Sequence, residues 1–418
     1  MNALRNWAGN IAFRAARVHR PSTVDELRRV VAGSRRIRPL GTAHSFNRIA
    51  DCADDMVSVA GLPPTIRVDA AASTVTVAAG VRYGALAAAL YAAGFALHNL
   101  GSLPHISVAG AVSTGTHGSG DGNGNLATAV RALRMVTADG ELVTLRRGAG
   151  GFAGAVVALG ALGVVVELTL DVQPAYDVRQ YVYEGLPWVR LVASLDEIFG
   201  AAYSVSLFTS WTGPVIDQVW VKRRVDPAQP AADAPASFLD AVAADRPRHP
   251  ILSMPADNCT TQLGVPGPWH ERLPHFRLDF TPSAGEELQT EFLVPRERAV
   301  AALSAVDEIR DKIAPVLQIS EIRSIAADDL WLSPSYQRDT IAIHFTWIAD
   351  GAAVLPVVAA VEEQLAPFAA RPHWGKIFTA DAAAVATRYD RWADFERLAA
   401  DFDPGGKLRP EYEAWLSV

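Results

Sequence analysis

Apolar residues in the first 175 positions form short segments separated by turn residues, a pattern typical of mixed strands and helices. Asp139-Gly140 stands between two apolar segments and predicts a tight turn that joins two strands. Residues 83–93 predict a helix that ends at Gly94, and residues 23–32 predict another with Ser22 as its N-cap. The segments expected to be strands are 36–40, 66–69, 74–77, 142–145 and 164–170.

The pattern changes beyond residue 175. Residues 226–250 are rich in Ala, Pro and Asp and predict an irregular surface segment. Helices are then expected over 298–313 and 354–368, and they alternate with four expected strands at 276–280, 288–293, 317–325 and 341–347. In the first of these strands the apolar residues share one face. This order favours an α+β fold in which helices cover one face of an antiparallel sheet.

Composition narrows the function classes. The 418 residues are 50% apolar, which is enough for a large core, and the net charge of -7 comes without any Lys/Arg run, so no nucleic-acid partner is expected. The two cysteines, Cys52 and Cys259, exclude a disulfide scaffold and a zinc cluster, and no metal site is expected. Because neither an apolar leader nor an unbroken apolar run of 18 residues is visible, we expect a cytoplasmic protein without membrane contact, and a monomer.

Two glycine-rich segments, 41–47 and 107–120, are suited to approach a ligand with the backbone. Their Gly, Ser and Thr residues expose N–H groups and hydroxyls, which a pyrophosphate needs as hydrogen-bond donors. Neither segment has the spacing of a P-loop or of the Rossmann dinucleotide fingerprint. On residue type alone, tight turns explain both segments equally well, and His44 has the character of an ordinary polar turn residue.

One expected strand of the second half carries charges in line with apolar residues. Side chains alternate faces along a strand, so Glu321 and Arg323 share a face with three apolar neighbours: Leu317, Ile319 and Ile325. Charged groups are rarely buried unless they are paired or functional. Two interpretations stay open, a structural pair of Glu321 and Arg323 on a solvated face, or a binding site.

The expected strand at 341–347 has the complementary pattern, with His344 and Thr346 opposite an apolar face. If the two strands are neighbours, its polar face meets Glu321 and Arg323. Such a cluster suits a ligand with many hydroxyls, because every buried polar group needs a partner. Lys376 follows the second expected helix, and by residue type alone it is a surface lysine.

Five motifs occur in a fixed order along the chain: RPLGTAHSFN, GSLPHISVAGAVSTGTHGSG, EIR, HFTW and RPHWGK. In this order they resemble the alditol oxidases, which are vanillyl-alcohol-oxidase-type FAD flavoproteins, as are the aldonolactone oxidases. The resemblance runs from residue 6 to residue 407. It implies a two-domain fold with an FAD-binding domain of residues 1–175, completed by 372–418. The substrate-binding cap domain would then be residues 176–371, an antiparallel sheet covered by helices.

The resemblance also implies the cofactor, an FAD whose flavin ring is covalently attached to His44. Ala43 stands where many family members have Gly, and we expect it to keep an ordinary backbone angle, because Ala disfavours positive φ. The other residues that the resemblance assigns to FAD are Gly41, Thr42, Ala43, Ser45, Phe46, Asn47, Ser102, Ser107, Gly110, Thr114, Gly115, Thr116, Gly118, Val164, Val165, His373 and Lys376.

The reaction implied by the resemblance is oxidation of the terminal C1 hydroxyl of alditols such as xylitol and sorbitol to the aldose, with hydride transfer to flavin N5 and reduction of O2 to H2O2. We expect His344 to assist removal of the hydroxyl proton, since an ordinary imidazole pKa lies near working pH. Two alternatives stay open, an aldonolactone oxidase or dehydrogenase on the same fold, and a flavin-binding protein without catalysis. The expected catalytic residues are Glu321, Arg323, His344 and Lys376, and the expected substrate contacts are Ser102, Glu321, Arg323, Thr346 and Lys376.

Overall fold

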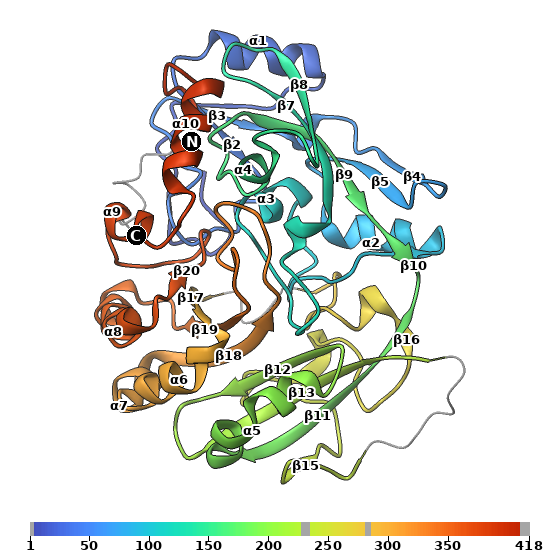
Figure 1. Cartoon of the computed structure of the whole chain (residues 1–418), viewed down its shortest axis with the longest axis vertical. Coiled ribbons are helices and arrows are strands. Elements are labelled where there is room, and N and C mark those ends of the chain that lie inside the picture. Colours follow the sequence, from blue (N-terminus) through green and yellow to red (C-terminus); the bar gives the residue numbers. More distant parts are fainter. Residues whose placement is uncertain (1–3, 227–234, 281–285, 410–418) are drawn as a thin grey trace.

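The computed structural model describes residues 4–226, 235–280 and 286–409. Figure 1 shows the first and last parts of the chain, blue and red, side by side at one end of the molecule, with the green-to-orange middle part at the other end. Hydrogen bonds join the two chain ends, because the Lys407 ammonium donates to the carbonyls of Val31 and Ala32, and the Ile37 amide donates to the carbonyl of Lys407. The predicted domain limits at 175 and 372 stay a prediction.

Two larger sheets and one two-stranded sheet form the part of the fold built by the first 175 residues. The parallel sheet has the order β1 (Arg17–His19), β3 (Asp55–Ser58) and β2 (Ile37–Leu40). The antiparallel sheet has the order β4 (Ile66–Asp69), β5 (Thr74–Ala78), β9 (Val164–Asp171), β7 (Val130–Val136) and β8 (Leu142–Arg146). Their helices are α1 (Val24–Gly33), α2 (Tyr83–Ala92), α3 (Val108–Ser113) and α4 (Phe152–Val156), and β6 (Phe95–Ala96) pairs with β10 (Gln173–Pro174).

Local sequence signals account for the ends of these elements. Gly94 and Gly140 take positive φ values of 81° and 86°, so the expected helix end after α2 and the tight turn between β7 and β8 are both confirmed. The predicted N-cap of α1 is wrong by one residue. Thr23 caps the helix by accepting from the Glu26 amide, while the Ser22 hydroxyl donates to the Glu26 carboxylate.

A ten-stranded antiparallel sheet occupies the other end of the molecule (Figure 1). Its order is β14 (Ser237–Phe238), β15 (Ala241–Ala243), β11 (Asp177–Pro187), β13 (Val215–Arg224), β12 (Ser204–Thr209), β18 (Leu317–Ile325), β19 (Thr340–Trp347), β17 (Leu288–Pro295) and β20 (Arg371–Pro372), with β16 (Gly267–Pro268) paired to β11. The predicted α+β class, with helices on one face of an antiparallel sheet, is confirmed. The helices are α5 (Trp188–Gly200), α6 (Ala299–Asp307), α7 (Arg310–Ile313) and α8 (Gly351–Leu365), and α9 (Ala382–Ala386) and α10 (Trp392–Phe402) follow.

Alternation along β19 explains how the sheet uses its two faces. Four apolar side chains of β19 pack into the main hydrophobic core together with residues of α6 and α8: Ile341, Ile343, Phe345 and Trp347. The opposite face of β19 carries His344 and Thr346. The helices therefore cover one face of the sheet, and the other face is left for a cavity.

Several sequence predictions in this part are wrong in detail. Residues 276–280 form no strand, because Phe276 makes a single bridge with Cys259 and the chain then turns, which leaves Leu278 and Phe280 43% exposed. The expected helix 298–313 is split between α6 and α7 by the non-helical backbone of Ile309. In the expected irregular segment 226–250, residues 227–234 lie outside the described residues, and the remainder supplies the short strands β14 and β15.

One helical segment of the described chain, Gly351–Phe368, is long and apolar enough to cross a membrane, with a mean hydropathy of 1.2. Its buried residues lie on one face and join the core beneath the ten-stranded sheet: Val354, Val358, Val361 and Leu365. A single apolar helix that packs on a sheet is weak evidence for a membrane span.

Candidate active site

A cavity separates the glycine-rich segments from the helix-free face of the ten-stranded sheet. Its interior amounts to about 2030 Å³, part of which is open to solvent. One side, which we call the cradle wall, consists of residues 41–47 and 107–116. The other side, which we call the sheet wall, consists of the polar face of β17, β18 and β19 together with Lys376.

Glycines allow the two segments of the cradle wall to meet around one hydroxyl. A Cβ at Gly41 would lie 2.8 Å from Ser107 Oγ, and one at Gly110 would lie 2.9 Å from the same atom. The Ser107 hydroxyl is buried and has no hydrogen-bond partner within the described residues. A buried donor without a partner is costly, so this atom fits a ligand that brings acceptor oxygens, such as the pyrophosphate of FAD. The cradle wall therefore has the features that FAD binding requires.

His44 lines the same cavity and is held by its own turn. Its Nδ1–H donates to the carbonyl of Thr42 over 2.9 Å, and the ring of Trp7 stacks on the imidazole with centroids 5.4 Å apart and an interplanar angle of 13°. Burial lowers the pKa of His44 to about 4. The imidazole is consequently neutral at neutral pH and keeps one nitrogen lone pair, which bond formation to a flavin ring would need.

Ala43 contradicts the expectation of an ordinary backbone angle. Its φ is 57°, in the left-handed region that L-residues with a Cβ disfavour. The Trp7 amide donates to the Ala43 carbonyl over 2.8 Å and holds the turn in this conformation. The surrounding structure thus imposes the angle that a Gly would adopt without strain.

The loop of His44 is tied to the segment that carries Lys376. The Phe46 amide donates to the Gly375 carbonyl over 2.8 Å, and the Asn47 side-chain amide donates to the carbonyls of Trp374 and Lys376. These bonds bring the cradle wall and Lys376 together although they lie more than 300 residues apart in the sequence.

Most residues that the sequence assigned to FAD line the cavity. Gly115 and Gly118 do not line it: Gly115 turns the chain with a φ of 66°, and a Cβ at Gly118 would lie 2.4 Å from the Leu100 carbonyl oxygen. Those that do line it are Gly41, Thr42, Ala43, His44, Ser45, Phe46, Asn47, Ser102, Ser107, Gly110, Thr114, Thr116, Val164, Val165, His373 and Lys376.

Strand pairing places the charged residues of the sheet wall in one row. Glu321 of β18 pairs directly with His344 of β19, which pairs in turn with Glu291 of β17. The convergence of β18 and β19 predicted from the sequence is therefore confirmed. Leu317 is the exception, because a register shift between Leu317 and Ile319 takes it out of the expected alternation.

Lys376 lies at the centre of the cluster. Its Nζ is 2.7 Å from His344 Nδ1 and 2.8 Å from Glu291 Oε2. On the far side of the ring, His344 Nε2 lies 3.0 Å from Thr346 Oγ1. Because an ammonium only donates, His344 Nδ1 accepts from Lys376, and Nε2–H donates to the hydroxyl of Thr346.

Glu291 is a buried residue of this cluster that the sequence analysis did not single out. Its Oε1 accepts from Arg323 Nη2 over 2.6 Å and lies 3.3 Å from His117 Nε2, so together with the Lys376 contact it joins three basic groups. The prediction of a strand over residues 288–293 rests on the apolar residues of that segment alone. Like Glu321, Glu291 is a charged residue within a strand that carries apolar residues, and this pattern is the sequence signal for both.

Electrostatics set the protonation states of this row. Burial alone would raise the pKa of Glu291, but the nearby charges of Lys376 and Arg323 hold this pKa well below its usual range. Arg323 and His275 likewise lower the pKa of Glu321. Burial lowers the pKa of His344 far below its ordinary value, and the neighbouring Lys376 lowers it further. The assumption that His344 titrates near working pH is therefore wrong, and the ring is neutral.

Comparison with known proteins agrees with this geometry. An FAD binding domain model matches residues 15–146, and a D-arabinono-1,4-lactone oxidase model matches residues 286–416. An alditol oxidase from a Streptomyces species is 54% identical over 97% of this chain and 97% of its own length. The chain belongs to the alditol oxidase family of vanillyl-alcohol-oxidase-type FAD flavoproteins. The family predicted from the five motifs is confirmed.

Other matches place this alditol oxidase family member among wider relatives. An L-gulono-1,4-lactone dehydrogenase from Mycobacterium tuberculosis is 29% identical over 97% of both chains. A solvent-stable cholesterol oxidase has a similar solved structure, with a TM-score of 0.79 over 97% of this chain and 96% of that one, at 16% identity. A structural similarity at 16% identity supports the two-domain FAD-binding fold but gives no information about the substrate of this chain.

Proposed function

We propose that this protein is an FAD-dependent alditol oxidase that converts the C1 hydroxyl of xylitol, sorbitol and related polyols to the aldehyde of the aldose and produces H2O2. The observation that carries the proposal is the sheet wall, where two buried carboxylates and two buried cations face the cavity that the cradle wall closes. Such a wall offers both acceptors and donors to a chain of hydroxyls. The 54% identity to an alditol oxidase supports the same substrate class.

FAD would be held by the cradle wall, with its pyrophosphate at the Ser107 hydroxyl and the backbone around Gly41 and Gly110. When bound, the flavin supplies the chemistry of the reaction, accepting a hydride from the substrate C1 carbon and passing two electrons to O2. The residues of this chain orient the alcohol, move its proton and place charge.

The sheet wall gives each side chain a distinct task. Glu321 and Arg323 hold the first two hydroxyls, one as acceptor and the other as donor. Burial lowers the pKa of Lys376, so the step begins with a neutral Lys376 amine that accepts the proton held on His344 Nδ1. With the C1 hydroxyl in the place of Thr346, Nε2 takes the hydroxyl proton while Nδ1 passes its own proton to Lys376, which becomes an ammonium. Lys376 and Arg323 would stabilise the negative charge of the alkoxide or of the reduced flavin, and Ser102 and Thr346 contact further hydroxyls.

A substrate panel tests the proposal. The purified enzyme should release H2O2 with xylitol and sorbitol, and more slowly or not at all with L-gulono-1,4-lactone. Faster turnover of the lactone would favour the alternative of an aldonolactone oxidase. Flavin that no polyol or lactone reduces would favour a binding protein without catalysis.

We also propose that the flavin is bonded covalently to His44. The neutral, stacked imidazole supports this, as does the strained turn that presents it. A fluorescent flavin band should stay with the protein on a denaturing gel and disappear in His44→Ala. A His44→Ala protein that retains the band would contradict the assignment.

The location and assembly of the enzyme complete the proposal. Both cysteines are buried and free, which suits a reducing cytoplasm, and we propose a cytoplasmic monomer. Size-exclusion chromatography with light scattering should give the mass of one chain, 44.7 kDa. A mass of twice that value would contradict the monomer.

A further inference from the structure

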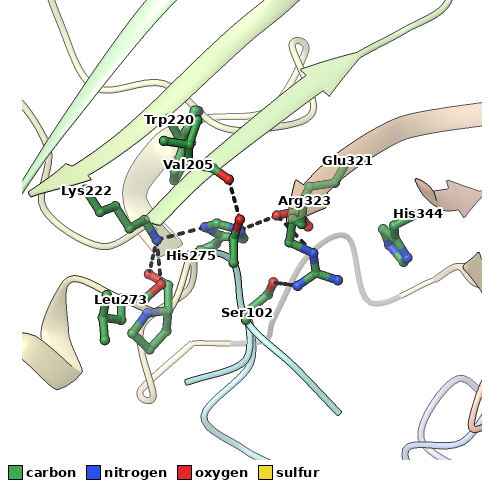
Figure 2. A network of polar contacts seen from close by, with 12 residues as sticks. Ser102, Val205, Trp220, Lys222, Leu273, His275, Glu321, Arg323 and His344 are labelled. Atoms are coloured by element: carbon green, nitrogen blue, oxygen red, sulfur yellow. Dashed lines mark hydrogen bonds and ion pairs between the residues drawn. The ribbon is translucent and has the colours of Figure 1, made fainter. Parts of the chain in front are cut away.

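A buried line of three ionisable side chains lies along one face of the ten-stranded sheet and ends at Glu321 (Figure 2). Lys222 lies on β13 and is 0% exposed, Glu321 lies on β18, and His275 stands between them on the segment that follows Pro274. Lys222 and His275 have no part in the proposed chemistry. A fully buried lysine is rare and calls for a physical account.

The hydrogen bonds of this line have a fixed direction. The Lys222 ammonium donates to the Leu273 carbonyl over 2.5 Å, contacts the Pro274 carbonyl at 3.4 Å and lies 3.1 Å from His275 Nδ1. Burial lowers the pKa of Lys222 to about 7, so the tautomer is set from the other end of the line. Because the Glu321 carboxylate only accepts, the proton of the neutral His275 ring sits on Nε2, and Nδ1 accepts from Lys222. That Nε2–H donates to Glu321 Oε1 over 2.7 Å.

Aromatic neighbours stop the imidazole from turning. The rings of Trp220 and Phe208 stand nearly perpendicular to His275, with centroids 5.2 Å and 5.4 Å away. The backbone is fixed as well, because the His275 amide donates to the carbonyl of Ser102, a residue of the expected substrate site, over 3.2 Å. His275 therefore has one position, one tautomer and one direction of donation.

The consequence falls on one oxygen of Glu321. Within the described residues, both side-chain contacts of its carboxylate involve Oε1: His275 Nε2 at 2.7 Å and Arg323 Nε at 3.6 Å. Glu321 also lines the cavity. With Oε1 occupied and the carboxylate unable to rotate, Oε2 is left to accept a hydrogen bond from a ligand.

We propose that His275, held at Nδ1 by Lys222 and donating from Nε2 to Glu321, is a positioning residue that aims Glu321 Oε2 at a hydroxyl of the polyol. This inference rests on the proposed alditol oxidase activity. His275 touches neither the substrate nor the flavin in this role, and acts only through the Glu321 carboxylate. Lys222 supports it from one step further away.

Two substitutions at His275 separate positioning from packing. His275→Phe keeps a planar ring between Trp220 and Phe208 but removes the donor to Glu321. His275→Gln restores an amide N–H near the place of Nε2. His270→Phe, in the same segment and outside the site, is the matched control.

The measurements use holoenzyme mixed anaerobically with xylitol and then with O2. We expect His275→Phe to raise the apparent Kd for xylitol roughly 10- to 100-fold, the loss expected for a hydrogen bond to a charged group, while reoxidation by O2 stays at the wild-type rate. The rise in Tm that xylitol causes should shrink in parallel. His275→Gln should recover binding to within about threefold of wild type, and His270→Phe should match wild type.

A double-mutant cycle tests whether His275 acts through Glu321. If it does, His275→Phe added to Glu321→Gln weakens xylitol binding by much less than the product of the two single effects. Multiplicative effects would overturn the inference, as would a His275→Phe enzyme that binds xylitol normally or a His275→Gln enzyme as impaired as His275→Phe. Wild-type flavin that xylitol and sorbitol fail to reduce would instead overturn the proposed function itself.

Discussion

The cradle wall presents backbone and small side chains to the cavity, whereas the sheet wall presents charged side chains. The cradle wall depends on missing atoms, because a Cβ at Gly41 or Gly110 would meet the Ser107 hydroxyl. The sheet wall depends on compensated charge, because Glu291 is bonded to Arg323 and Lys376 in a fully buried position. Adding an atom should therefore impair flavin binding at the cradle wall, and removing a charge should impair the reaction at the sheet wall.

The largest effect is expected behind the cradle wall, from Gly118→Ala. The new Cβ would lie 2.4 Å from the Leu100 carbonyl oxygen and 2.6 Å from the Asn99 side chain, so the backbone that leads to Ser102 must shift. We expect most of the bound flavin to be lost. The ratio of flavin absorbance to protein absorbance in the purified protein measures this loss.

Gly122→Ala is the matched control for this substitution. A Cβ at Gly122 would meet nothing within 4 Å, so its flavin content should equal that of the wild type. Full flavin content in Gly118→Ala would show that the backbone behind the cradle wall tolerates an added atom, and it would weaken the contrast between the two walls.

The next effect concerns the sheet wall, where Glu291→Gln keeps the shape of the side chain and removes its charge. Lys376 and Arg323 would then be two buried cations for which Glu321 is the remaining nearby carboxylate among the described residues. We expect flavin reduction by xylitol to slow roughly 100-fold, since a hydrogen bond between charged groups is worth about 1.5–3 kcal/mol. Stopped-flow reduction measures this directly.

Exposed Glu286→Gln supplies the control for Glu291→Gln, since it removes a carboxylate from the same part of the chain without touching the cavity. Flavin content should remain normal in both variants. If Glu291→Gln is reduced at the wild-type rate, compensated charge is not what the sheet wall depends on.

A smaller effect compares the acid stability of the two walls. His44 on the cradle wall and His275 behind the sheet wall both have a pKa lowered to about 4, mainly by burial. The unfolded chain binds these protons near pH 6.5, so stability is fully present above that pH and is lost as the pH falls toward about 4. Each histidine contributes up to about 1.4 kcal/mol per pH unit in this window.

Thermal unfolding of the flavin-free protein, in which the His44 imidazole is unmodified, measures this loss between about pH 4.5 and 7.5, the window that the histidine pKa values define. Replacing His275 by Gln, or His44 by Asn, should flatten the acid side of the Tm profile, and comparison of the two variants shows which wall loses more stability. An unchanged profile in both variants would mean that neither buried imidazole is forced to stay neutral.

The two walls also differ in how far the sequence predicts them. Strict alternation along β19 placed His344 and Thr346 on one face, and pairing with β18 then brought Glu321 and Arg323 to them. Glu291 shows the same sequence signal, a charged residue within a buried strand, but it is absent from the site that the sequence predicts. The motifs of the cradle wall identified FAD through resemblance, while the glycines alone were equally compatible with plain turns.

Long-range contacts are what local patterns could not supply. His275 lies 46 residues before Glu321 and belongs to a segment without regular structure, so no periodicity connects them. The same segment misled the strand prediction at 276–280, because apolar alternation forms a strand only where a partner strand is available. The hydrogen bond from Trp7 to the Ala43 carbonyl, which holds the turn of His44, is equally invisible to local propensity.

The smallest expected effect is on the free energy of unfolding and comes from removing an atom of the cradle wall, the Cβ of Ala43. Ala43 has a φ of 57°, which costs an L-residue about 1–2 kcal/mol, and Gly reaches this angle without a clash. The greater freedom of Gly in the unfolded chain offsets part of the gain, so Ala43→Gly should raise the free energy of unfolding by about 1 kcal/mol or less. The rise in Tm should be about 1–2 °C for a chain of this size.

Ala72→Gly, which neighbours the positive-φ residue Ser73 but is not itself at positive φ, is the control and should lower the Tm. The gel assay for covalent flavin gives Ala43→Gly a second readout. If the turn itself presents His44, the variant should retain the flavin band, because Gly keeps the same backbone angle without strain. The Ala43 methyl group packs against the cluster that contains Ile11 and Phe13. A lower Tm together with loss of the band would mean that this packing stabilises the turn by more than the positive φ of Ala43 destabilises it.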